Sequence, residues 1–212
     1  YLPGTDWTKV LTDKLAERFT ALGGELITGA TVTKINLSTA GHQVTVSKNG
    51  LENIINGNIL INTAPPHVFL ALSNYQDRKL KQIQYLDALS LIVETKQKLP
   101  RELYLLSCLK PRYSFGGIFA LSSLNDTLGT ENGSVLNFFT TLSPKYDHFR
   151  NKKPKELLDI YQGDFKKIFG FRLYPLWHQL TLIKNYSPKF LKGYENPDQR
   201  GNVKGIYFAG NY

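Results

Sequence analysis

The 212-residue sequence has a single cysteine and no apolar run that approaches the roughly 20 residues of a membrane span. The lone thiol, Cys108, cannot close an internal disulfide, which favours a reducing compartment. Its leucine neighbours favour a core residue over a nucleophile. Residues 1–5 carry neither the basic nor the apolar part of a secretion signal. We therefore expect a cytoplasmic protein, with peripheral contact to a membrane left open.

Methionine is absent altogether, even at position 1, and the sequence begins and ends with tyrosine. This pattern predicts a fragment of a longer parent protein. A natural truncation, a proteolytic one, or a sequence written without modified methionines would each explain it, as would chance, and these alternatives stay open.

Most motifs of catalysis and cofactor binding are also missing. No Gly-x-Gly-x-x-Gly fingerprint, Walker loop or Gly-x-Ser-x-Gly elbow occurs. The four histidines, His42, His67, His148 and His178, lack metal-ligand spacing, so no metal site is expected. No acid–base pair stands out, and the catalytic residues remain unassigned.

Positive charge is in excess, with 26 Lys and Arg against 17 Asp and Glu and a formal net charge of +9. The densest run, residues 150–155, is typical of a solvated loop before a helix. The alternative is attraction to an anionic surface or substrate. Nucleic acid is not expected as a partner, because no stacking platform is interleaved with these charges.

Two segments, 5–22 and 154–169, have the apolar periodicity of amphipathic helices. Thr5 or Asp6 can cap the first, and glycines follow both. Alternating or β-branched runs, with turn signals such as Asn49-Gly50, indicate strands. The predicted strands cover residues 25–28, 31–37, 43–47, 59–64, 89–95, 115–121, 134–142, 180–183 and 205–210.

The run 59–64 is apolar almost throughout, which suggests a strand covered on both faces, as in a parallel sheet. The order of elements predicts a mixed α/β (α+β) fold: a helix comes first, then strands, then a mixed middle segment and one last strand. The first and last parts of the chain then form one discontinuous domain, and the middle part is inserted between them. We place the domain segments at 1–66, 67–190 and 191–212.

Three segments in order carry a resemblance to a known family. They are Tyr1-Leu-Pro-Gly4 with the helix, Gly23-Gly24 and 27–35; Ile59-Leu-Ile-Asn-Thr-Ala-Pro-Pro66; and Val203-Lys-Gly-Ile-Tyr-Phe-Ala-Gly-Asn211. Together they resemble the flavin-containing amine oxidase superfamily, which includes protoporphyrinogen oxidases and phytoene-desaturase-like enzymes. The resemblance is close over 1–66 and about 172–212, and looser between. It implies a discontinuous, Rossmann-like FAD-binding domain (1–66 and 191–212) with an inserted mixed or antiparallel substrate domain (67–190).

The resemblance also implies which residues contact FAD. The Val32 backbone would contact the adenine, residues 63–65 would pass near the dinucleotide, and Gly210 would let the chain approach the pyrophosphate. Asn211 replaces the usual Asp and keeps hydrogen bonding without charge. The family's glycine-rich loop would precede Tyr1, so we expect FAD in the parent protein but weak binding and no activity from these residues alone. The implied cofactor contacts are Val32, Thr63, Ala64, Pro65, Gly210 and Asn211.

On the substrate side, the candidates are aromatic residues of the middle segment, with ordinary core packing as the alternative for each. The predicted reaction oxidises a C–N or C–C bond of a largely apolar small molecule, and FAD takes the electrons. Two alternatives stay open: a porphyrin or isoprenoid oxidase at a membrane surface, and a non-catalytic binding module on the same fold. The oligomeric state is also open. The substrate candidates are Tyr113, Phe115, Tyr174 and Trp177.

Overall fold

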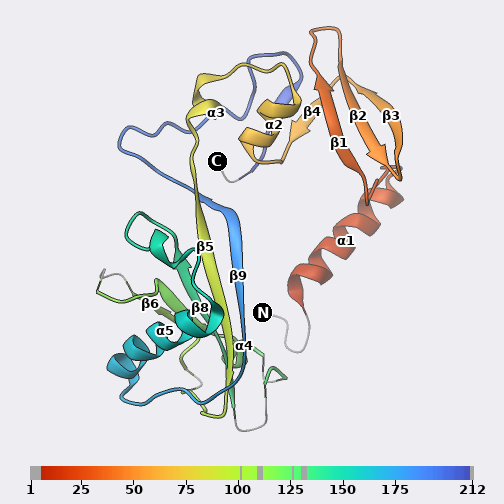
Figure 1. Cartoon of the computed structure of the whole chain (residues 1–212). Helices are drawn as coiled ribbons and strands as arrows, with labels where there is room; N and C mark the ends of the chain where they lie inside the picture. The colour runs from red at the N-terminus through yellow and green to blue at the C-terminus, as the bar shows by residue number, and fades with distance from the viewer. Residues whose placement is uncertain (1–5, 101, 109–111, 126, 130–132, 211–212) are drawn as a thin grey trace. The chain divides into compact units, whose positions relative to one another are not determined.

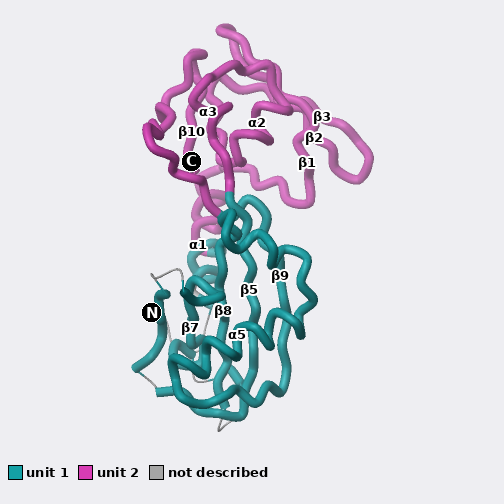
Figure 2. Tube along the Cα trace, turned by 60° about the vertical axis from the view of Figure 1, so that its left-hand side comes forward, with its two compact units in different colours: residues 1–13, 86–186 teal, residues 14–85, 187–212 magenta. Residues whose placement is uncertain are grey.

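The computed structural model describes residues 6–100, 102–108, 112–125, 127–129 and 133–210. The chain divides into two compact units, drawn in two colours in Figure 2: unit 1 is 1–13 with 86–186, and unit 2 is 14–85 with 187–212. The predicted domain segments change at 66/67 and 190/191, whereas the units change at 85/86 and 186/187. The assignment of those segments to FAD and substrate domains stays a prediction.

The first helix, α1 (Trp7–Ala21), forms where the periodicity predicts it. Asp6 caps its start, because its Oδ1 accepts a hydrogen bond of 2.9 Å from the backbone N–H of Thr8. The chain leaves the helix through Gly23, whose φ of 86° is in the left-handed region. Thr5, the other predicted cap, lies outside the described residues.

Unit 2 contains a three-stranded antiparallel sheet in the order β1-β2-β3 (Figure 1). Its strands are β1 (Thr31–Asn36), β2 (His42–Lys48) and β3 (Leu51–Gly57). Asn49 and Gly50 have φ values of 53° and 79°, which confirms the predicted two-residue hairpin. The predicted strand at 25–28 is wrong: this segment pairs with no strand among the described residues, and a strand needs a hydrogen-bonded neighbour.

A second, parallel pair in unit 2 joins β4 (Leu60–Asn62) to β10 (Ile206–Phe208). Helices α2 (Pro66–Leu72) and α3 (Arg78–Gln82) follow β4. The parallel pairing predicted for 59–64 is confirmed. Coverage on both faces is not, because the side chain of Ile61 is 61% exposed. The buried core of unit 2 comprises Ile35, Phe69, Tyr75, Leu80, Ile206 and Phe208.

Unit 1 is built on a five-stranded sheet in the order β6-β7-β8-β5-β9. Its strands are β5 (Tyr85–Thr95), β6 (Leu105–Ser107), β7 (Gly117–Ala120), β8 (Ser134–Thr141) and β9 (Pro175–Pro188). The remaining elements are α4 (Leu121–Leu124), a 3-10 turn η1 (Asp147–Phe149) and α5 (Pro154–Phe169), which ends at Gly170. The mixed α/β class predicted from the sequence is confirmed.

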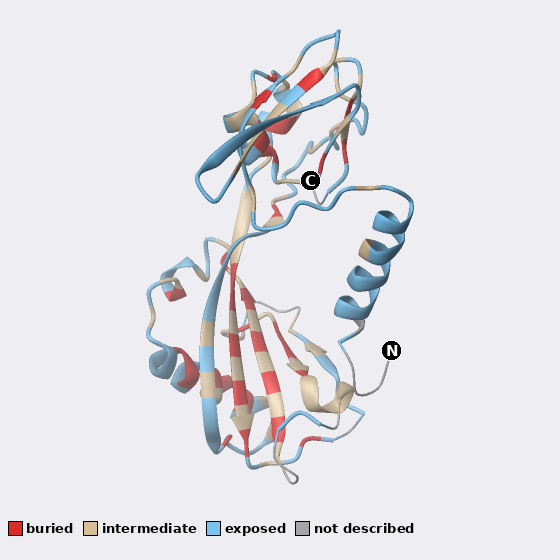
Figure 3. Ribbon diagram, turned by 90° about the vertical axis from the view of Figure 1, so that its right-hand side faces the viewer, coloured by how far each residue is buried: buried red, intermediate tan, exposed pale blue. Residues whose placement is uncertain are grey.

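One face of the unit 1 sheet packs against α5. Along β5 and β8 buried residues alternate with half-buried ones, as Figure 3 shows in the strands of this sheet. Tyr161 of α5 is fully buried in this core, and its hydroxyl lies 2.6 Å from Thr140 Oγ1. Burial raises the pKa of Tyr161 to about 12, so the side chain is a neutral hydrogen-bonding group at physiological pH.

Cys108 packs at the margin of the same core, half-buried, as the sequence predicts for a structural thiol. Burial raises the pKa of its thiol above the usual value, which favours the protonated, less nucleophilic form. In the part of the chain that is described, no helix combines the length and the apolar character needed to cross a bilayer.

Candidate functional site

The carboxyl ends of β4 and β10 meet at one edge of unit 2, because the two strands run parallel. Ile206 pairs with Leu60 and Phe208 with Asn62, and the N–H of Ala209 then donates to the Asn62 carbonyl at 3.0 Å. In open α/β sheets, ligands bind beyond the carboxyl ends of the strands. Four predicted FAD contacts follow the two strand ends and are thereby brought together: Thr63, Ala64, Pro65 and Gly210.

Small residues leave the end of β10 open to a ligand. Ala209 and Gly210 are exposed and line a hollow of about 560 Å³, together with Ile61 of β4, Tyr207 and Phe208 of β10, and residues 196–199. No side chain larger than a methyl group extends from either position, so the backbone can approach a bulky anionic group such as a pyrophosphate. The edge therefore fits one flank of a dinucleotide site. Asp198 on the wall of the hollow is the unfavourable element, and Lys79 Nζ lies 3.7 Å from its carboxylate.

Asn62 shapes this edge and was not among the predicted site residues. It is 7% exposed, and its Nδ2 donates to the carbonyl of Ala64 at 2.8 Å. This bond holds the turn that follows β4, where the chain leaves the sheet towards Pro65. The signal was present in the sequence: Asn62 is the one polar residue within the apolar run 59–62.

Replacing Asn62 with leucine should destabilise the turn while keeping the branching and the number of heavy atoms of the side chain. Leucine cannot donate to the Ala64 carbonyl, so we expect the free energy of unfolding of unit 2 to fall by about 1–3 kcal/mol. Hydrogen exchange at the amides of β4 and β10 measures this loss. Asn53→Leu, on the exposed strand β3, is the control and should change stability little. Equal protection in wild type and Asn62→Leu would show that the bond contributes nothing.

Val32 lies in the other sheet of unit 2, on β1, which is an edge strand. A bulge follows it: Val32 pairs with Val46 but Lys34 with Thr45, so Thr33 is unpaired in the ladder. Apart from a bridge between Ile35 and Ser73, the outer side of β1 has no strand partner among the described residues, which suits the backbone contact to adenine that the resemblance implies. That contact stays a prediction, and Asn211 lies outside the described residues.

Two of the substrate candidates are neighbours in unit 1. The rings of Tyr113 and Phe115 stack at 6.4 Å between centroids. Phe115 is fully buried and packs edge-on against Phe138 and Tyr161, at 5.2 and 5.5 Å. These contacts agree with ordinary core packing, which is the alternative to substrate binding expected for Phe115 from the sequence. Tyr113 is half-buried, and its carbonyl accepts a hydrogen bond from the Tyr146 hydroxyl at 2.8 Å.

Of the other two candidates, Tyr174 immediately precedes β9 and is 67% exposed, and Trp177 lies near the start of β9 and is 47% exposed. The carbonyl of Tyr174 accepts from the backbone N–H of Lys96 at 3.2 Å. No ring contact joins either residue to Tyr113 or Phe115 within the described ranges. The structure thus brings Tyr113 and Phe115 together but not the other two, and a role in substrate binding stays a prediction for all four.

The face of the sheet opposite α5 carries aromatic residues that were not predicted. Phe139 of β8 contacts Phe119 of β7 at 6.4 Å and Tyr186 of β9 at 5.4 Å between ring centroids. Beside them, Ser90 Oγ donates to Asn137 Oδ1 at 2.8 Å. Strand alternation was the available signal, because adjacent residues of β8 must lie on opposite faces.

A parallel pair with small residues at its carboxyl edge is compatible with one flank of a dinucleotide site. Residues 8–212 match the family described as flavin containing amine oxidoreductase, and the chain belongs to this family. The family resemblance read from the sequence is confirmed, and so are its class, oxidoreductase and flavoprotein, and its cofactor, FAD.

Solved structures of several oxidoreductases share the fold of this chain at low sequence identity. A putative protoporphyrinogen oxidase from Exiguobacterium sp. 255-15 matches with 15% identity and a TM-score of 0.67, over 93% of this chain and 45% of its own. A redesigned putrescine oxidase matches with 15% identity and a TM-score of 0.67, over 94% of this chain and 46% of its own. Cyclohexylamine oxidase from Brevibacterium oxydans IH-35A matches with 13% identity and a TM-score of 0.58, over 85% of this chain and 42% of its own. The chain therefore spans less than half the length of these relatives. No curated protein sequence matches it.

Proposed function

We propose that this chain forms one flank of the flavin site and a substrate-facing sheet of an FAD-dependent oxidoreductase. The reaction is oxidation of a C–N or C–C bond in a largely apolar small molecule. The observation that carries the proposal is the convergence of residues 63–65 and Gly210 at the carboxyl edge of the β4–β10 pair. FAD, when bound, supplies the electron acceptor.

The chain's own residues bind and orient in this proposal. Gly210 and Ala209 allow close approach of the backbone, and Asn62 fixes the turn that presents residues 63–65. Val32 offers edge-strand backbone groups to the adenine. None of these roles needs an acid–base pair, so the lack of an obvious pair in the sequence does not count against the proposal.

The apolar character of the substrate is supported by the half-buried aromatic residues on the open face of the unit 1 sheet, Phe119 and Phe139. Such a surface binds apolar groups through burial and ring contacts. The names of two relatives, putrescine oxidase and cyclohexylamine oxidase, support C–N oxidation. The name protoporphyrinogen oxidase, carried by a third, supports the porphyrin alternative.

Gly210→Val tests the flavin edge. A branched side chain at the end of β10 should block the close approach of the dinucleotide, so we expect the affinity for FAD to fall at least about tenfold, or about 1.4 kcal/mol. The measurement is the flavin absorbance retained by the purified full-length gene product, followed by titration of the apoprotein with FAD.

Gly163→Val on α5 is the matched control, because a Cβ at Gly163 meets no atom within 4 Å. Both variants should keep the thermal unfolding of wild type. Unchanged FAD affinity in Gly210→Val would refute the proposed edge. A full-length protein without any flavin absorbance would favour the non-catalytic binding module instead.

A further inference from the structure

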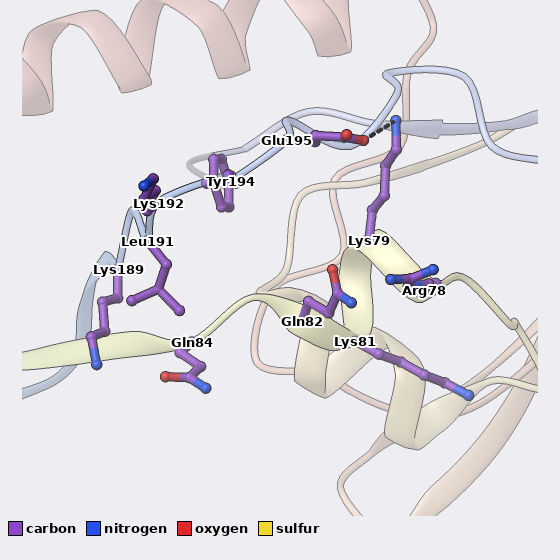
Figure 4. Close-up of a pocket in the computed structure, with 11 residues that line it drawn as sticks. Arg78, Lys79, Lys81, Gln82, Gln84, Lys189, Leu191, Lys192, Tyr194 and Glu195 are labelled. Carbon is purple, nitrogen blue, oxygen red and sulfur yellow. Dashed lines mark ion pairs between the residues drawn. The ribbon is translucent and has the colours of Figure 1, made fainter.

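A groove in unit 2 lies between two segments that are far apart in the sequence. Residues 78–84, on and after α3, form one wall and residues 189–195 form the other, around a hollow of about 740 Å³ (Figure 4). The N–H of Lys189 donates to the carbonyl of Gln84 at 2.8 Å, which ties the two walls together. The groove is thus a built feature of this unit.

The walls of this cationic groove carry five basic side chains and one carboxylate, Glu195. Lys79 Nζ lies 3.6 Å from Glu195 and 3.7 Å from Asp198, so its charge is balanced, and Lys81 donates to Gln76. The others form no ion pair within the described residues. Cations left without counter-charges around one hollow attract anions. The basic residues are Arg78, Lys79, Lys81, Lys189 and Lys192.

Two exposed apolar side chains belong to the second wall: Leu191 lines the hollow, and Phe190 precedes it in the chain. In the sequence Lys189-Phe190-Leu191-Lys192, Phe190 is 64% and Leu191 is 48% exposed. The ring of Phe190 packs edge-on against Tyr194, at 5.0 Å between centroids, which holds it in place. A site for free inorganic phosphate would need only the basic side chains and no exposed apolar residues. An exposed apolar pair flanked by lysines suits a bilayer, where the pair enters the acyl boundary and the cations meet headgroup phosphates.

We propose that the cationic groove, together with Phe190 and Leu191, docks this protein on the surface of an anionic phospholipid bilayer. The interaction goes beyond the proposed oxidoreductase function and does not depend on it. The lysines and Arg78 contact lipid phosphates, and the two apolar side chains insert at the interface. The docking is peripheral, so it requires no membrane-spanning helix.

The test is co-sedimentation of the full-length gene product with vesicles of phosphatidylcholine alone and of phosphatidylcholine mixed with phosphatidylglycerol. We expect partitioning onto the anionic vesicles only, weakened by added salt. The double variant Lys189→Glu, Lys192→Glu should reduce partitioning at least about tenfold, because each basic residue near the surface contributes several-fold. Phe190→Ser with Leu191→Ser should reduce it by a similar factor.

Matched controls distinguish binding by this surface from non-specific binding through positive charge or exposed apolar residues elsewhere on the protein. Lys152→Glu with Lys155→Glu makes the same charge change in the basic run of unit 1, and Leu51→Ser removes a side chain that is 77% exposed on β3. Neither should alter partitioning. Flavin content, measured on the same samples, should be unchanged in all variants, so a failed flavin assignment is recognised separately.

Two outcomes would overturn the proposal. Equal losses in the control and groove variants would mean that diffuse positive charge binds the vesicles. Binding of inorganic phosphate that depends on Lys189 and Lys192, without any vesicle binding, would assign the groove to a small anion instead.

Discussion

Gly205→Ala should lower the free energy of unfolding of unit 2 by about 2–5 kcal/mol. Gly205 has a φ of 84°, which costs an L-residue about 1–2 kcal/mol. A Cβ built there would also overlap the carbonyl oxygen of Asn58 and lie 2.9 Å from His42 Nε2. The Asn58 oxygen belongs to the backbone, and the His42 side chain is only 2% exposed, so neither group can move away freely.

Gly193→Ala is the matched control, because Gly193 has a φ of 80° but a Cβ there meets no atom within 4 Å. This variant should show the backbone cost alone, about 1–2 kcal/mol. Urea denaturation followed by hydrogen exchange in β2, β4 and β10 measures both. Equal losses for the two variants would show that the close packing around Gly205 has no energetic consequence.

The same contact bears on the flavin edge. The Gly205 carbonyl accepts a hydrogen bond of 2.8 Å from the N–H of Leu60, immediately before the β4–β10 ladder begins. A side chain at Gly205 pushes the two strands apart at their amino ends, so residues 63–65 and Gly210 lose their alignment. We therefore expect Gly205→Ala to lose FAD affinity as well as stability, whereas Gly210→Val loses affinity alone.

Local signals in the sequence predicted the elements whose structure is decided locally. The Asn49-Gly50 hairpin and the helix 154–169 with its glycine stop need only turn chemistry and periodicity. The segment 25–28 failed because a strand depends on a partner, which composition does not supply. The tight approach of Gly205 to Asn58 could not be predicted either, since it joins residues far apart in the chain.

The candidate site divides in the same way. Residues 63–65 and Gly210 were expected from the family resemblance, and the parallel pairing brings them to one edge. Asn62 was missed because periodicity treats a polar residue in an apolar run as an interruption, although it bonds the turn that follows. The cationic groove combines α3 with residues 189–195, and only the tertiary fold makes that combination visible.

Phe138→Ala should be the most disruptive change in unit 1. Phe138 is fully buried on the α5 face of β8, and its ring contacts Phe115, Tyr161 and Phe165 at 5.2, 5.5 and 6.1 Å between centroids. Truncation removes three ring contacts and leaves a cavity, so we expect a loss of about 3–5 kcal/mol in the free energy of unfolding. Chemical denaturation monitored by near-ultraviolet circular dichroism measures it.

The adjacent residue provides the matched control, because Phe139→Ala removes the same ring from the opposite face of the sheet. Phe139 is half-buried against Phe119 and Tyr186, so Phe139→Ala should cost no more than about half as much stability. If the open face binds the apolar substrate, Phe139→Ala should also raise the KM for that substrate several-fold, with flavin content unchanged. Equal destabilisation by both variants would mean that the two faces are packed alike. In that case the open face could not be the substrate surface.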